Sequence, residues 1–175
     1  MQFEVSPDDT DDLRCVGHII KIAFFKGGNE RWLHRFVKWW TRSKYSHVEL
    51  LLNDETWVSI SPFIRARVET KIVLNYSEAD WDFIEFSISE TQIRALKDFV
   101  AETTGDGYDW PGMLLSQIMP FIIKSRGKWY CSSFIAHCLA YSSVIKLRRL
   151  GLYEIPDLHP GKLYGILSKA ASENI

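Results

Sequence analysis

The fold that we expect for this chain rests on the stretch at 128–136, KWYCSSFIA. Its Cys131 follows two aromatic residues and begins an apolar run, Cys131–Leu139, that predicts a helix. A helix N-terminus stabilises a thiolate, and its free N–H groups can bind an oxyanion. These features make Cys131 a candidate nucleophile, although a free cysteine is more commonly a small buried apolar residue.

The remaining cysteines have weaker claims to reactivity. Cys15 lies in the acidic N-terminal stretch, and Cys138 lies inside the predicted helix beside apolar residues, where packing is the simpler role. Three cysteines without framework spacing argue against a disulfide scaffold. The sequence has no CxxC or HxxxH spacing and no phosphate-binding glycine loop, so we expect neither a metal nor a cofactor.

Strand signals dominate the chain before residue 89. Runs rich in β-branched and aromatic residues predict strands at His18–Phe25, His47–Leu52, Thr56–Ser61, Val68–Leu74 and Trp81–Ile88. The turn pair Asn53-Asp54 joins the second and third of these into a hairpin.

Helical signals follow. Ser89 and Gln92 form a capping box before an apolar periodicity, and further helices are expected at 110–123 and from Cys131. Strands first and helices later predict an α+β fold. We expect a central, mostly antiparallel sheet of about five strands with helices packed on it.

Length and composition predict one domain. With 175 residues and 46% hydrophobic content, the chain can bury a real core, so we expect a flexible lead at 1–17 and a single domain at 18–170. A formal net charge of −1 does not favour a nucleic-acid partner. The acidic N-terminus lacks a signal sequence, and the apolar run 113–123 is too short to span a bilayer. We expect a soluble cytoplasmic protein of a kind that suits a phage or a bacterium.

A basic and aromatic helix is expected at 31–42. Its basic residues recur at 31, 35, 38 and 42, and its apolar face contains Phe36 and Trp40. Such a helix can make peripheral contact with an anionic membrane. The commoner interpretation is a surface helix with solvated basic residues, whose Trp32 or Trp39 covers the rim of the core.

The residues alone leave the general base open among five histidines: His18, His34, His47, His137 and His159. His47 begins a predicted strand after Tyr45-Ser46, so its ring can emerge at the sheet edge. A single histidine on a strand is nevertheless more often a core residue with its hydrogen bonds satisfied.

Four motifs, taken in order, resemble one known family. They are KYSHVEL at 44–50, GYDWPG at 107–112, CSSFIA at 131–136 and HPGKL at 159–163. Together they resemble the permuted NlpC-like papain-fold thiol hydrolases, in the branch with YiiX-like and lecithin:retinol acyltransferase-like proteins. In that family the histidine strand precedes the cysteine helix, and the last motif is a closing turn.

The resemblance implies a circularly permuted papain-like domain in which His47 is the base for Cys131. It implies a third polar residue that orients the imidazole. Ser59 occupies the matching position without a charge, and Glu49, two residues after His47 on the same strand face, is an alternative. The oxyanion would be held by the Cys131 N–H and by Tyr45 or Tyr130.

The implied activity is hydrolysis of an amide bond, in a peptide or peptidoglycan-type substrate, through a thioester. Two alternatives stay open. One is a lipid ester hydrolase or acyltransferase at a membrane surface, which the 31–42 helix and the apolar run 113–123 favour. The other is a catalytically silent papain-like binding domain, which the uncharged Ser59 favours.

Overall fold

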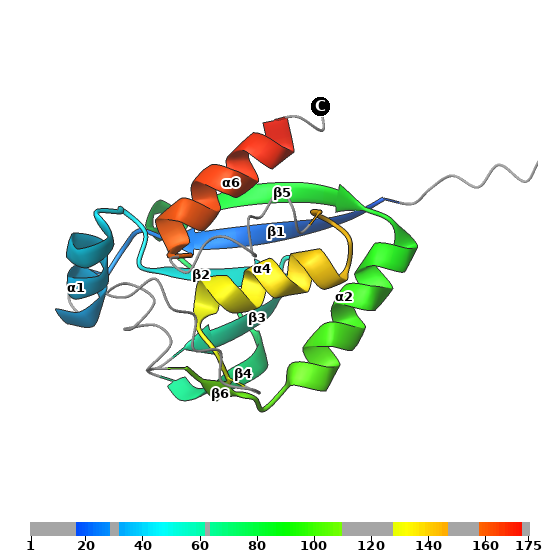
Figure 1. The fold of residues 1–175 in the computed structure, drawn as a ribbon, viewed down its shortest axis with the longest axis horizontal. Coiled ribbons are helices and arrows are strands. Elements are labelled where there is room, and N and C mark those ends of the chain that lie inside the picture. The colour runs from blue at the N-terminus through cyan, green and yellow to red at the C-terminus, as the bar shows by residue number, and fades with distance from the viewer. Residues whose placement is uncertain (1–16, 29–31, 62–63, 110–127, 147–157, 173–175) are drawn as a thin grey trace, which may run out of the picture.

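The strand-rich part of the sequence forms a mixed sheet in the computed structural model, which describes residues 17–28, 32–61, 64–109, 128–146 and 158–172. The sheet has seven strands in the order β5-β1-β2-β3-β4-β6-β7 (Figure 1). Neighbouring strands are antiparallel except β6 and β7, which are parallel. The α+β class is therefore as predicted.

Five strands lie close to the predicted segments: β1 (His18–Phe25), β2 (His47–Leu51), β3 (Thr56–Ser61), β4 (Ile64–Ile72) and β5 (Trp81–Ile88). The predicted total of about five strands was wrong, because β6 (Gly107–Tyr108) and β7 (Lys128–Trp129) extend the sheet. Each has two residues, which is too short for an alternating pattern to be recognised.

Four α-helices lie within the described residues: α1 (Trp32–Thr41), α2 (Glu90–Thr103), α4 (Cys131–Tyr141) and α6 (Pro160–Ser172). A short 3-10 helix, η1 (Glu78–Asp80), precedes β5. One core cluster joins alternate residues of the strands, such as Ile20, Ile22 and Phe24, to the apolar faces of α2, α4 and α6. None of these helices is both long and apolar enough to cross a membrane.

The HPGKL segment differs from the expected closing turn. Pro160 is the first residue of α6, where its missing N–H is not needed, and the helix continues for 13 residues with Leu163 and Leu167 in the core. The predicted lead at 1–17, apart from its last residue, and the predicted helix at 110–123 lie outside the described residues.

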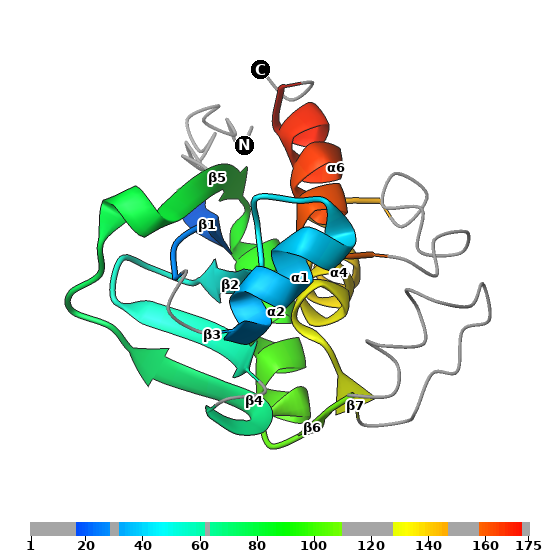
Figure 2. The ribbon, with the colours of Figure 1, turned by 90° about the vertical axis from the view of Figure 1, so that its left-hand side faces the viewer.

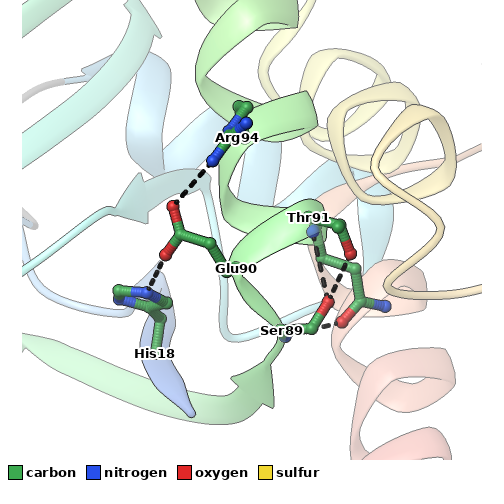
Figure 3. Close-up of polar contacts among 6 residues, drawn as sticks. His18, Ser89, Glu90, Thr91 and Arg94 are labelled. Atoms are coloured by element: carbon green, nitrogen blue, oxygen red, sulfur yellow. Dashed lines mark hydrogen bonds and ion pairs between the residues drawn. The ribbon is translucent and has the colours of Figure 1, made fainter. Parts of the chain in front are cut away.

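Helix α2 begins at the predicted capping box. Ser89 Oγ accepts a hydrogen bond from the Gln92 backbone N–H at 3.2 Å, and Gln92 Oε1 accepts one from the Ser89 N–H at 2.9 Å. Beside the cap, Glu90 Oε2 lies 2.6 Å from His18 Nε2, so the first residues of α2 and β1 are paired (Figure 3).

Replacement of the capping side chain tests this account of α2. Ser89→Ala should lower the free energy of unfolding by about 1 kcal/mol, because an N–H of the first turn loses its partner. Urea denaturation measures the change. Ser77→Ala is the matched control, since Ser77 precedes η1 without a side-chain cap bond. Equal losses in the two variants would contradict the assigned role of Ser89.

Candidate active site

Cys131 is the first residue of α4, and the helix holds it at the sheet. The preceding residue, Tyr130, has extended backbone (φ −111°, ψ 159°) and provides no side-chain cap to the helix N-terminus. Phe134, Ile135 and Leu139 are fully buried, and α4 packs on β2 and β3. The helix N-terminus therefore presents Cys131 and its backbone N–H groups to the start of β2.

A second contact fixes the start of α4. The Ser132 hydroxyl is buried and donates a hydrogen bond to the backbone carbonyl of Leu158, just before α6. The two helices thus share a polar contact directly beside Cys131. We expect this contact to limit rotation of the first helical turn.

His47 is buried as the first residue of β2, opposite Phe25 in β1. Its Nε2 lies 3.1 Å from Glu49 Oε1, and the Cys131 side chain lies close enough to influence the pKa of His47. Burial disfavours the imidazolium and is the largest single influence on the pKa of His47. Charge and hydrogen bonding from Cys131 and Glu49 outweigh burial and raise this pKa from 6.5 to about 10.

Glu49 is buried and pairs with two cations. Its Oε1 accepts hydrogen bonds from His47 and from Lys71 Nζ, the latter at 2.8 Å. Burial alone would raise the pKa of Glu49, but His47 and then Lys71 hold it below its usual value. The four side chains form a continuous row in the order Cys131, His47, Glu49 and Lys71.

Sequence reasoning did not single out Lys71. It lies on β4, 22 residues from Glu49 in the chain. No feature of the sequence near Lys71 indicates that it pairs with Glu49. The contact depends on the register of β3 against both β2 and β4.

Ser59 is buried on β3, and its hydroxyl has no hydrogen-bond partner within the described part of the chain. The imidazole of His47 is hydrogen-bonded to Glu49 and lies beside Cys131. The structure therefore brings Glu49, and not Ser59, to the imidazole as a hydrogen-bonding partner. Glu49 Oε2 is a second buried oxygen without a partner among the described residues.

The two tyrosines predicted to bind an oxyanion differ in their surroundings. Tyr45 donates its single hydroxyl proton to Asp82 Oδ2 at 2.6 Å, so that proton is not available to an oxyanion near Cys131. Burial, followed by Asp82, raises the pKa of Tyr45. Tyr130 adjoins Cys131, and its ring packs against the core.

Tyr108 is a further candidate that the sequence offered only as part of its GYD motif. It is buried and pairs with Trp129, two residues before Cys131, where β6 meets β7. Burial raises the pKa of Tyr108 well above its usual value, and the nearby negative charge of Cys131 raises it further. A phenol of this kind keeps its proton and can donate it in a hydrogen bond.

Each of the other four histidines has a described partner other than Cys131, and His47 is the histidine whose described interactions include Cys131. The hydrogen-bond partners of these four are Glu90 for His18, Ser46 for His34, the Ser133 carbonyl for His137 and the Lys162 N–H for His159. Cys138 is buried within α4, and burial raises the pKa of its thiol.

The described residues contain no group of three or more histidine, cysteine or acidic side chains placed to hold a metal ion. No known family model and no curated protein matches the chain.

A titration of His47 tests the row of charges. By NMR, the imidazole should lose its proton near pH 10, and Glu49→Gln should lower this pKa because one negative partner is removed. Since the folded-state pKa exceeds 6.5, the imidazolium stabilises the fold fully below pH 6.5, and this contribution is lost as the pH rises through 10.

Glu85→Gln is the control for that titration, because it removes the same charge from an exposed carboxylate paired with Lys21 on another part of the sheet. The signal of His47 is assigned by its loss in His47→Gln. A His47 pKa near 6.5 in the unmodified chain would contradict this account of the charged row. The same His47 pKa in Glu49→Gln and Glu85→Gln would contradict it as well.

Proposed function

We propose that the chain is a thiol hydrolase in which Cys131 is the nucleophile and His47 the general acid and base. The observation that carries this proposal is the placement of a cysteine at a helix N-terminus beside a buried imidazole that is also paired with Glu49. In this proposal Glu49 orients the imidazole of His47, and Lys71 keeps Glu49 ionised.

The proposed first half-reaction acylates Cys131. The thiolate sulfur attacks the substrate carbonyl carbon, and the resulting oxyanion accepts a hydrogen bond from the Cys131 N–H. The bond from this carbon to the leaving nitrogen or oxygen then breaks. The leaving group takes the proton of the His47 imidazolium, and a thioester remains on Cys131.

The second half-reaction releases the acyl group. Neutral His47 takes a proton from water, and the water oxygen forms a bond to the thioester carbonyl carbon. The carbon–sulfur bond breaks, the carboxylic acid leaves and Cys131 returns as thiolate. An acceptor alcohol or amine in place of water would make the same step an acyl transfer.

The proposed fold is the circularly permuted papain-like domain, since the strand that bears His47 precedes the helix that bears Cys131. The resemblance favours an amide substrate of the peptide or peptidoglycan type. A lipid ester is the second candidate, and the exposed aromatic face of α1 favours it. Glu49 supplies the charge that Ser59 lacks, which weakens the argument for a silent binding domain.

The rate of alkylation distinguishes the proposed nucleophile, Cys131, from the buried Cys138. Iodoacetamide should modify Cys131 faster than Cys138, because Cys131 lies at a helix N-terminus beside His47 and is 7% exposed, whereas Cys138 is fully buried. Peptide mass spectrometry measures both rates. His47→Ala should slow the modification of Cys131 by roughly a hundredfold or more. Equal rates at the two cysteines would contradict the proposed nucleophile.

Turnover tests the reaction itself. A panel of fluorogenic peptide amides and lipid esters should include a substrate whose hydrolysis falls at least about a thousandfold in Cys131→Ala. Cys138→Ala is the matched control and should retain activity. An acyl group on Cys131 that hydroxylamine removes would identify the thioester. Selective alkylation without turnover of either substrate class would instead favour the silent binding domain.

A further inference from the structure

Helix α1 exposes an unusual set of large apolar side chains. Trp32 is 75% exposed, Trp39 72%, Trp40 42% and Phe36 36%. The expectation that Trp32 or Trp39 covers the rim of the core was therefore wrong. Figure 2 views the molecule from the side on which α1 lies, in front of the other described elements. A contiguous exposed apolar face of this kind marks an interaction surface.

The aromatic rings contact one another and surround a hollow. The ring centroids of Phe36 and Trp40 are 5.6 Å apart, and those of Trp39 and Trp40 are 6.1 Å apart. An open hollow of about 430 Å³ is lined by Trp32, Arg35, Phe36 and Trp39. Among the described residues, its walls combine apolar rings with one guanidinium group.

The chain segment that bears this face is basic, although Lys44 in it is paired with Asp82. From residue 31 to residue 48 the sequence contains five basic residues and no acidic one. Arg35 and Arg42 are exposed, whereas Lys38 Nζ is turned toward the carbonyls of Lys26 and Gly27. Exposed tryptophans beside arginine, with no nearby carboxylate on the same segment, complement an anionic lipid headgroup region.

Helix α1 is also tied to the strand that bears His47. His34 Nδ1 lies 2.9 Å from Ser46 Oγ, and the Ser46 N–H donates to the Phe25 carbonyl at 3.0 Å. The Phe25 ring packs against His34, with centroids 5.2 Å apart. A surface that held α1 would therefore hold the start of β2, and with it His47, close to that surface.

We propose that the aromatic face of α1, formed by Trp32, Arg35, Phe36, Trp39 and Trp40, docks on an anionic phospholipid surface. Docking would present acyl bonds of that surface to the site at Cys131. This catalytic part of the proposal rests on the proposed function. A two-fold contact with a second copy is disfavoured, because it would bring the arginines of the two α1 faces together. A protein partner, for which tryptophan and arginine are also suited, predicts instead that the chain does not bind anionic vesicles at low salt.

Vesicle co-sedimentation of the full chain carrying Cys131→Ser tests docking apart from catalysis. The chain should sediment with vesicles of phosphatidylcholine containing roughly a quarter phosphatidylglycerol, and much less with phosphatidylcholine alone. Trp32→Ser with Trp39→Ser should weaken binding by about tenfold or more, since two interfacial rings are lost. Arg35→Glu should weaken it in a salt-dependent way.

Two matched variants serve as controls. Ile72→Ser with Leu74→Ser removes two equally exposed apolar side chains from another surface, and Lys97→Glu makes the same change of charge on α2. Both should bind vesicles as the parent does. Circular dichroism shows that each variant is folded before it is compared. Equal binding by all variants, or no binding to the anionic vesicles at low salt, would overturn docking through α1.

A further outcome distinguishes a lipid surface from a second copy of the chain as the partner of the α1 face. A dimer that forms without lipid and is lost in the Trp32 and Trp39 double variant would assign the face to a second copy and overturn the proposal. With active chain, that double variant should lose hydrolysis of vesicle-borne esters while its kcat/KM on a water-soluble ester is unchanged. Vesicle binding without hydrolysis of any ester would support docking through α1 and would contradict the presentation of acyl bonds to Cys131.

Discussion

The burial of α4 against β2 and β3 is the constraint on which the site depends. Phe134, Ile135 and Leu139 fill the core on one helix, so α4 cannot move along the sheet without opening that core. Its first residue is consequently held beside the first residue of β2. Two elements distant in the chain thus bring a thiol and an imidazole together, and neither residue requires a special backbone conformation for this contact.

Charge in such a buried place is unfavourable unless each group has a partner. His47 lies between Cys131 and Glu49, and Glu49 lies between His47 and Lys71, so positive and negative groups alternate. Lys71 is partly exposed at the end of this row, where water can also solvate it. The low dielectric that makes an unpaired charge costly strengthens each of these pairs. The row therefore favours an imidazolium that is ready to donate a proton.

Local sequence signals were sufficient for β1, β5 and the start of α2, because alternation and a capping box are properties of neighbouring residues. The position of Glu49 relative to His47 also follows from the two-residue period of a strand. Lys71 and Tyr108 could not be predicted in this way. Their places depend on strand register and on the pairing of β6 with β7, which are set by contacts between distant segments.

Two departures from ordinary folding rules adjoin the start of β2. Ionisable groups are buried at His47 and Glu49, while α1, joined to the same strand through Ser46, leaves Trp32 and Trp39 in solvent. The core needs neither feature, since it is already filled by the apolar faces of α2, α4 and α6. Local rules are most often broken where a protein functions. The proximity of the two departures therefore supports a single function that joins surface contact to chemistry at Cys131.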